Sequence, residues 1–442
     1  MNNEKIDLIE KILNSKNIQE YEISHIEKKA YESIFLKDRV DNEREVTCFE
    51  YSLRILSQRK NETGIGIVRG NSLKPQDIEK NIDICLTLSK INLSTKYHFP
   101  AKALIDKISI YDKNVIEAPL DAKKNLVEEL LSKIKQKKEV NPTFGRFRVH
   151  VDEIFLRNSN SIDVSALKSY FFIEFSLKAQ KNGKLSEYWP FVVIKEKKHL
   201  DFSSRIEKWA KLALDTLKAK PPKPAKDATI IFSPQVLHDA INPVIDVHAS
   251  GKAFHEMVTL FKMNEKIASE NITMYDDGLL EGGFATNNWD GEGTQHQRNE
   301  IIKKGYFQKI LFDQKYAMVE NTESSGNGKK AIDGSVINGI SNLEILPGEM
   351  TLDEIISIIK EGYYIEQFSW LNPSELTGTF GAEIRNGYYI KDGKFENPIK
   401  LGNVSGNIIQ MIQNCVYISK EREFFANSLF PYMAFKNLTV SS

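Results

Sequence analysis

The sequence predicts an α+β fold with two domains. Residues 1–218 mix helical and strand periodicity, which favours an N-terminal α/β sandwich-like domain of helices packed on a sheet. Residues 227–442 hold short apolar runs between clusters of Gly, Asn and Asp, which favours a C-terminal mainly β domain with many turns. Between them, residues 219–226 contain three prolines within four positions, so this segment is predicted to be an extended linker.

The overall composition excludes several functional classes. The 442 residues include 60 Lys+Arg and 60 Asp+Glu, and this zero net charge argues against direct nucleic-acid binding, which needs a basic excess. No stretch approaches the roughly 20 apolar residues that span a bilayer, and the charged N-terminus does not resemble a signal peptide. The three cysteines, Cys48, Cys85 and Cys415, lie far apart, which argues against a disulfide scaffold. We therefore expect a cytoplasmic protein without membrane or nucleic-acid partners.

The zero net charge hides opposite charges on the two halves. Residues 1–226 hold 42 basic and 32 acidic residues, a net of +10, and residues 227–442 hold 18 and 28, a net of −10. Two solvated surfaces would explain this split. Attraction between the halves, or toward a partner of opposite polarity, would explain it as well.

The first half is predicted to combine helices with antiparallel strands. Apolar residues at helical spacing predict helices within residues 3–34, 74–91 and 121–138. Alternating patterns predict strands at residues 45–59, 64–70, 147–157, 169–180 and 188–194. Cys85 falls on the apolar stripe of its helix and is interpreted as core. Asn182-Gly183 indicates a tight hairpin, and Ser204 with Glu207 resembles a capping box that opens a further helix.

The second half is predicted to hold few helices. A short strand at residues 228–232 leads to Ser233-Pro234, which caps and begins a helix. Thr351 and Glu354 form a capping box for a helix over residues 351–360. Residues 384–390 and 394–395 predict a hairpin, and Ile408 to Val416 is a helix-like run that contains Cys415.

Two pairs of a histidine and an acidic residue begin a zinc motif, but neither pair completes it. His-Glu-x-x-His and His-Glu-x-x-x-His need a second histidine four or five positions after the first. After His255-Glu256 those positions hold Thr259 and Leu260, and after His238-Asp239 the fifth position holds Pro243, which cannot coordinate a metal. We therefore predict no metal ligands at these positions and interpret three histidines as polar or half-buried side chains: His238, His248 and His255.

Other catalytic signatures are incomplete. The sequence holds no Gly-x-Ser-x-Gly elbow and no phosphate-binding loop of the Gly-x-x-x-x-Gly-Lys type. A group of acidic residues could bind a hard cation but lacks the spacing of a calcium loop, so we interpret its members as turn residues: Asp276, Asp277, Asp290 and Glu292. Residue chemistry alone therefore predicts no complete catalytic set.

The order of turn motifs along the second half resembles the TldD/PmbA family, also known as "modulator of DNA gyrase" proteins and regarded as zinc metalloproteases. The resemblance covers the whole chain and is strongest over residues 227–442. Its motifs are Tyr275–Gly278, Trp289–Thr294, Gly305–Phe307, Thr322–Gly328, Ser341–Leu343, Leu346–Gly348, Glu361–Tyr364, Leu376–Phe380, Gly387–Ile390, Asn397–Ile399 and Val404–Ile408.

The resemblance is to the PmbA, or TldE, branch of the family. The TldD branch carries His-Glu-x-x-x-His early in its second domain and a cysteine ligand in a late glycine-rich segment. Here the motif positions fall at His238, Asp239 and Pro243, and the late cysteine segment is missing, while Ile231–Val236 resembles the PmbA start of this helix. The resemblance therefore implies no catalytic residue, no metal ligand and no cofactor in this chain, with zinc in a partner subunit.

The implied function is that of a non-catalytic, substrate-binding subunit of a heterodimeric zinc metalloprotease that degrades or processes small or unfolded peptides. The implied partners are a TldD-type subunit, or a second copy in a homodimer, and peptide substrates. Glycine, asparagine and hydroxyl residues of the motifs would line a peptide chamber, although tight turns alone would also explain them: Asn327, Asn342, Thr377, Gly378, Ser405 and Asn407.

Two alternatives remain open at this point. The chain could be a self-sufficient metallopeptidase if folding brought His248 and His255 together with Asp276 and Asp277. It could also be a peptide-binding regulator that acts on gyrase or another partner without proteolysis.

Overall fold

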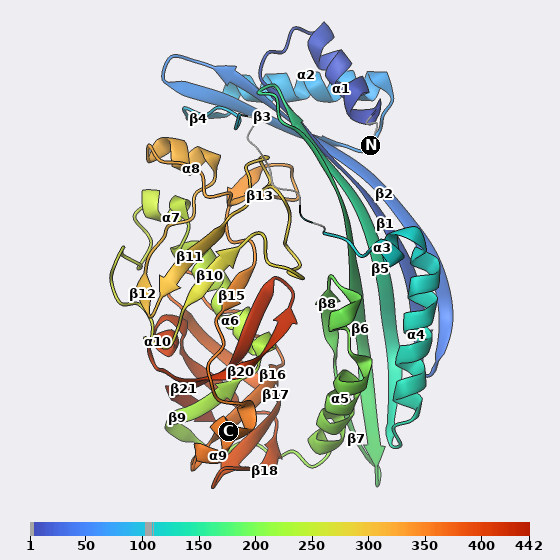
Figure 1. Cartoon of the computed structure of the whole chain (residues 1–442), viewed down its shortest axis with the longest axis vertical. Helices are drawn as coiled ribbons and strands as arrows, with labels where there is room; N and C mark the ends of the chain where they lie inside the picture. Colours follow the sequence, from blue (N-terminus) through green and yellow to red (C-terminus); the bar gives the residue numbers. More distant parts are fainter. Residues whose placement is uncertain (1–3, 102–107, 109) are drawn as a thin grey trace.

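The computed structural model describes residues 4–101, 108 and 110–442. Two large β-sheets organise the chain: an eight-stranded sheet built by the first half, here sheet A, and an eleven-stranded sheet built by the second half, here sheet B. In Figure 1 the long, curved strands of sheet A stand beside the smaller, more tightly coiled strands of sheet B. This arrangement confirms the predicted α+β class.

Sheet A is antiparallel and has the order β4-β3-β2-β1-β5-β6-β7, with β8 also paired to β6. The β6–β7 hairpin turns at Asn182 and Gly183, whose φ angles of 52° and 75° confirm the predicted turn. The strands span β1 (Tyr21–Leu36), β2 (Arg39–Gln58), β3 (Glu62–Gly70), β4 (Leu93–Thr95), β5 (Val140–Asn158), β6 (Asp163–Lys181), β7 (Lys184–Tyr188) and β8 (Phe191–Ile194).

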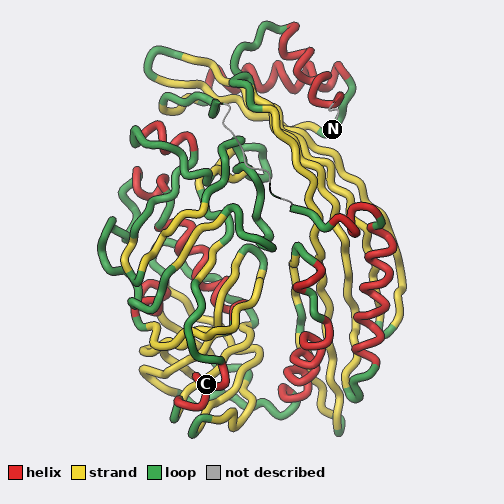
Figure 2. Tube along the Cα trace, viewed as in Figure 1, coloured by secondary structure: helices red, strands yellow, loops and turns green. Residues whose placement is uncertain are grey.

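Two pairs of helices pack on sheet A. Helices α1 and α2 cover β1–β3 with a cluster that includes Ile9, Ile82 and Cys85, so the interpretation of Cys85 as core is confirmed. Helices α4 and α5 bury Leu130 and Trp209 against β5 and β6. Figure 2 shows these helices as two groups beside the long strands. The helices span α1 (Glu4–Ser15), α2 (Pro75–Ile91), α3 (Lys113–Glu117), α4 (Pro119–Lys135) and α5 (Phe202–Thr216).

Sheet B curves far enough for its last strand in the sequence, β21, to pair with its first, β9. Its order is β12-β11-β10-β15-β21-β19-β17-β16-β9, and β21 pairs with β9 as well, which gives a barrel-like closure. The remaining strands β18 and β20 pair with β17 and β21, and β13 and β14 form a separate ribbon. The strands span β9 (Ala225–Phe232), β10 (Met274–Asp277), β11 (Arg298–Lys303), β12 (Tyr306–Phe307), β13 (Gly328–Lys330), β14 (Val336–Asn338), β15 (Leu343–Ile345), β16 (Glu361–Phe368), β17 (Thr379–Lys391), β18 (Lys394–Ile399), β19 (Asn403–Asn407), β20 (Cys415–Phe425) and β21 (Ser428–Ser441).

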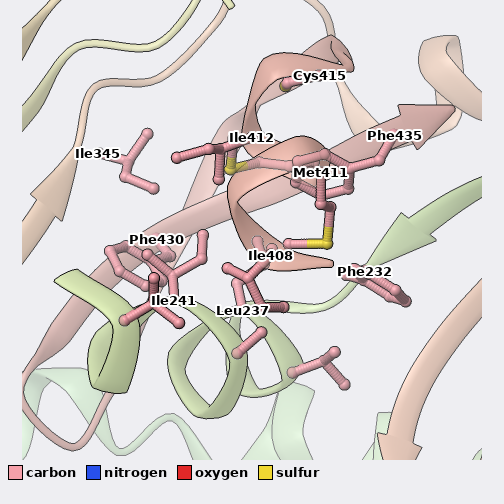
Figure 3. Close-up of a cluster of buried hydrophobic side chains, with 14 of the residues drawn as sticks. Phe232, Leu237, Ile241, Ile345, Ile408, Met411, Ile412, Cys415, Phe430 and Phe435 are labelled. Atoms are coloured by element: carbon pink, nitrogen blue, oxygen red, sulfur yellow. The ribbon is translucent and has the colours of Figure 1, made fainter. Parts of the chain in front are cut away.

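Helices α6 and α10 fill the core of sheet B. Figure 3 shows Leu237 and Ile241 of α6 facing Met411 of α10 and Phe430 of β21, all of them buried. The capping box of Thr351 on α9 is confirmed. The helices span α6 (Pro234–His248), α7 (Gly251–His255), α8 (Gln314–Val319), α9 (Leu352–Ile358) and α10 (Ile408–Gln413). In the described part of the chain, no helix is long and apolar enough to cross a membrane.

Three local predictions were wrong. Residues 21–34 form β1 rather than a helix, because β1 pairs along its whole length with β2 and β5; residue 3 of the predicted range lies outside the described residues. Helix α5 is capped by Asp201, whose carboxylate accepts from the Ser204 N–H, so the predicted capping box is absent there. Cys415 begins β20, because α10 ends at Gln413.

Buried charges tie sheet A to the second half of the chain. The Arg54 guanidinium of β2 lies 3.4 Å from Glu22 Oε2 of β1 and 3.6 Å from Glu292 Oε1 of the loop before β11. Tyr97 Oη accepts from Arg54 at 2.7 Å and donates to Glu292 at 2.6 Å. Lys330 of β13 forms an ion pair with Glu22. The Arg54 charge helps to compensate both buried carboxylates, because Glu22 and Glu292 are only 0% and 1% exposed.

We predict that Arg54→Met destabilises the protein by about 3–5 kcal/mol, because it leaves two buried carboxylates undercompensated. Urea unfolding measures this loss. Arg69→Met on the neighbouring strand is the matched control, since its ion pair with Glu50 is half exposed and should cost less than about 1 kcal/mol. Equal effects of the two variants would contradict the role given to the buried network.

Candidate functional site

Helix α6 enters the interior as its sequence predicts. The Ser233 hydroxyl accepts from the Val236 N–H at 3.3 Å, and Pro234 occupies the first turn. Pro243 lies within the same helix, where it offers neither an N–H nor a side-chain donor atom. The helix therefore carries His238, Asp239 and Pro243 at the positions where a zinc motif would carry its three functional groups.

The His238 ring is held by neighbouring polar side chains. Its Nδ1 lies 2.9 Å from Ser428 Oγ and 3.1 Å from Asn242 Nδ2, and its ring packs edge-on against Phe425. Burial lowers the pKa of His238 to about 4, so the imidazole is neutral at pH 7. The Nδ1 atom of His238 is thus already hydrogen-bonded within the protein.

Asp239 is a half-buried carboxylate without a hydrogen-bond partner among the described residues. Burial raises its pKa to about 7, since no cation stabilises the ionised form. The group would be partly protonated at neutral pH, and it faces no second metal ligand from position 243.

The other two histidines belong to separate networks. His248 Nδ1 accepts from the Leu260 N–H at 3.2 Å, so its Nε2–H donates to the Leu376 carbonyl at 3.1 Å. His255 Nδ1 lies 2.7 Å from Glu320 Oε1 on the surface. Across residues 4–101, 108 and 110–442, no three His, Cys, Asp or Glu side chains are arranged to share a metal ion. These residues therefore do not fit a zinc ion, and the metal site suggested from His248, His255, Asp276 and Asp277 is not assembled.

We predict that Asp239→Asn reduces the loss of stability that the protein shows as the pH rises. The folded-state pKa lies above the ordinary value of 3.8, so ionisation of Asp239 favours the unfolded chain, and stability falls between about pH 4 and pH 7. The difference in unfolding free energy between pH 4.5 and pH 8 should shrink by about 1–3 kcal/mol in the variant. Asp353→Asn, at an exposed site, is the control, and its unfolding free energy in urea should match that of the wild type at both pH values. A free energy of Asp239→Asn that changes with pH as much as that of the wild type would contradict the prediction.

The carboxylates that could have bound a hard cation form hydrogen bonds and ion pairs within the protein. Asp290 accepts from the N–H groups of Glu292, Thr294 and Gly328 at 2.8–3.0 Å, which confirms its interpretation as a turn residue. Asp276 and Asp277 lie instead in β10, so their interpretation as turn residues was wrong. The Asp276 carboxylate accepts from the Ser341 N–H at 2.6 Å and from Asn327 at 2.6 Å. Glu292 belongs to the buried network around Arg54.

We predict that Asp290→Asn costs about 1–3 kcal/mol, because an amide NH₂ would replace one of the oxygens that accept buried N–H groups. Thermal or urea unfolding measures the change. The control is Asp333→Asn at an exposed turn, where the carboxylate accepts from the Ser335 N–H at 2.9 Å and solvent can replace the lost bond. A larger loss of stability in Asp333→Asn than in Asp290→Asn would contradict the role given to the buried hydrogen bonds of Asp290.

A cavity of about 240 Å³ lies where the two halves meet at the start of α6. Phe191 of β8 and Phe425 of β20 are on its wall, together with the charged side chains of Lys208, Glu366 and Glu423. Lys208 Nζ lies 3.0 Å from Glu366 Oε1 and 3.5 Å from Glu423 Oε1. The sequence analysis missed this site, because its residues come from five separate segments and no local pattern marks the edge of a sheet.

The second half matches the family model described as "PmbA/TldA metallopeptidase C-terminal domain" over residues 225–442. The fold of the whole chain is similar to that of TldE from Thermococcus kodakarensis, with a TM-score of 0.86 and 21% identity over 98% of this chain and 100% of that one. The chain belongs to the TldD/PmbA family. A second structure, described as a modulator of a DNA gyrase from Thermotoga maritima, matches with a TM-score of 0.85 and 15% identity over 99% of both chains.

Several curated relatives are named as metalloproteases. One from Methanocaldococcus jannaschii is 25% identical over 327 residues, which is 69% of either chain. A TldD homologue from Buchnera aphidicola is 32% identical over 108 residues, which is 24% of this chain and 22% of that protein. The alignment with a metalloprotease from Methanothermobacter thermautotrophicus spans 44% of that relative. The names of these relatives agree with the assignment of the chain to a family of metalloproteases.

The six residues predicted to line a peptide chamber fall into two groups. Asn327 and Asn342 are 1% and 0% exposed, and their amides bond to Asp276 and to the Asp277 carbonyl. Exposed Thr377, buried Gly378 and half-buried Asn407 lie together, where the Asn407 amide donates to the Thr377 carbonyl at 2.6 Å and the Ile408 N–H donates to the Gly378 carbonyl at 2.7 Å. Ser405 is exposed on β19, opposite Gly381. Their role as chamber lining in this TldD/PmbA protein stays a prediction.

Proposed function

We propose that this chain is the non-catalytic, substrate-binding subunit of a cytoplasmic TldD/TldE-type zinc metalloprotease that acts on small or unfolded peptides. One observation carries the proposal: α6 holds Pro243 and an engaged His238 where a metal-binding helix needs two free imidazoles. A TldD-type partner would supply the zinc and the catalytic groups, and this chain would supply part of the peptide-binding surface.

A free sheet edge at the cavity between the two halves supports peptide binding. Strand β8 pairs only with β6 among the described strands, whereas β20 pairs with β21 and also bridges to Met350 through Ser419. Residues of both strands are on the cavity wall, and Phe191 and Phe425 have ring centroids 6.0 Å apart. An extended peptide can add to such an edge through main-chain hydrogen bonds, which require no particular side-chain sequence. This mode of binding suits unfolded substrates.

An exposed apolar segment after α7 supports association with a partner. Met257 is 89% exposed and Leu260 is 57% exposed, and three neighbours in the sequence are 40–43% exposed: Phe254, Val258 and Met263. Clustered apolar side chains on a surface are typical of protein–protein contacts. The partner could be a TldD-type subunit or a second copy of this chain.

The proposal predicts that the purified chain binds less than about 0.1 zinc per chain and cleaves no peptide, whereas a mixture with a TldD-type subunit holds zinc and cleaves unfolded peptides. Elemental analysis and a fluorogenic peptide assay measure both properties, since tight catalytic sites retain one metal per active chain. Size-exclusion chromatography with light scattering then separates a heterodimer from a homodimer.

Each alternative gives a different result in the same experiment. One zinc per chain together with cleavage by the chain alone would establish a self-sufficient metallopeptidase and overturn the proposal. Stable binding to gyrase, with no cleavage in the presence of any TldD-type subunit, would favour the non-proteolytic regulator.

A further inference from the structure

A group of polar side chains, several of whose buried atoms have no hydrogen-bond partner among the described residues, lies between one face of sheet A and the second half of the chain. We call it the polar cluster: His150 and Asp152 of β5, Lys168 of β6, Lys195 after β8, and His296 before β11. In β5 and β6 the register places Asp152 beside Lys168 and His150 beside Tyr170, so these side chains share one face. The Tyr170 ring stacks on His150 at 4.3 Å and meets Phe284 of the second half at 5.2 Å.

Both halves contribute to the polar cluster. Lys195 Nζ donates to the Thr286 carbonyl at 2.8 Å, which holds the loop before β11 against sheet A. The same loop carries His296, and the Lys168 charge is close enough to lower the pKa of both groups further than burial alone does, to about 3 for His296 and about 7 for Lys195. The register of β6 with β8, in which Phe172 pairs with Val193, also brings the chain at Lys195 beside the end of β6 that carries Lys168 and Tyr170.

The polar cluster is poorly satisfied by the protein itself. Asp152 and His296 are only 6% and 8% exposed, yet Asp152 Oδ1 and the Nδ1 atoms of His150 and His296 have no partner among the described residues. Neither Lys168 nor Lys195 has a carboxylate within 4.0 Å in the described chain. Buried polar atoms are otherwise almost always bonded, and an unpaired one costs about 1–3 kcal/mol. Against the one carboxylate of Asp152, the polar cluster sets two lysines and two imidazoles that can donate hydrogen bonds, and this excess of donors favours an anionic ligand with several acceptor oxygens.

The polar cluster neighbours the cavity between the two halves through contacts of β6 and β8. Lys168, Tyr170 and Phe172 follow one another on the same face of β6, and the Phe172 ring packs edge-on against Phe191 of the cavity wall at 5.4 Å. Lys195 follows β8 directly, four residues beyond Phe191. Four residues of extended chain span roughly 13 Å. A short peptide that adds to the free edge of β8 can therefore place one end in the cavity and the other end at Lys168 and Lys195.

We propose that the polar cluster binds the C-terminal carboxylate of a peptide held along β8, with Lys168 and Lys195 as its cationic partners. This inference rests on the proposed peptide-binding function and adds the group by which the peptide is recognised. The two lysines neutralise the carboxylate, and the imidazoles of His150 and His296 offer N–H groups to its oxygens. Peptides with a free C terminus are thereby favoured over internal segments of a longer chain.

The test measures binding of the five-residue peptide Ala-Gly-Ala-Val-Ala, labelled with fluorescein at its N terminus, to the full chain by fluorescence anisotropy. The free acid should bind at least about tenfold more tightly than the C-terminal amide. Lys168→Met should remove that preference, and Lys168→Arg should retain most of it. Lys184→Met, at an exposed position on β7, is the matched control and should behave as the wild type. Circular dichroism and thermal unfolding confirm that each variant folds.

The outcomes separate this inference from the function on which it rests. Equal binding of acid and amide, unchanged in Lys168→Met, would overturn the carboxylate site while leaving peptide binding intact. A peptide amide with a glutamate side chain that binds as tightly as the free acid would show that acidic side chains, and not the C terminus, are recognised, and it would overturn the assignment. Loss of binding for every peptide, acid or amide, would overturn both proposals.

Discussion

The buried guanidinium of Arg54 is the contact on which the relation between the two halves depends. Arg54 belongs to sheet A, yet it compensates Glu292 of the second half as well as Glu22 of its own sheet. Charged side chains are rarely buried without a fixed partner, because their desolvation is costly and only a precise geometry offsets it. The network therefore specifies one orientation of sheet A relative to the loop before β11, and that loop also carries His296 and the carbonyl that holds Lys195.

The apolar contacts between the halves also hold sheet A against sheet B. Helix α5 contributes Trp209 and Ala213 to a cluster that also contains Tyr364 and Tyr432 of sheet B. The hydrophobic effect has no directional preference, so this cluster stabilises the association without fixing its register. The cavity borders the apolar contact through Trp209, and both halves supply residues to the cavity and to the polar cluster.

Much of the fold was accessible from the sequence, and most of the site was not. Hairpin turns such as Asn182-Gly183 and caps such as Ser233 are decided by neighbouring residues, so they were predicted correctly. Strand β1 was misread because its pairing with β2 and β5 is long-range and overrides a local helical pattern. The assignment of His238, Asp239 and Pro243 to the zinc-motif positions came from the family resemblance and stays a prediction, although the structure does place all three on one helix. The cavity and the polar cluster, by contrast, combine residues more than a hundred positions apart, and no spacing rule brings Lys168 near His296.

The proline-rich segment before β9 has the composition of a flexible hinge, but the packing around it describes something else. Lys220 within this segment bridges to Ile399 of sheet B, and α5, immediately before it, is buried between both sheets. A hinge lets two domains move apart at little cost in free energy. Here, separation would expose the apolar side chains of α5, which pack against residues of both sheets. The two halves are thus expected to behave as one mechanical unit, and to have changed together over time, since neither surface could be altered without a matching change in the other.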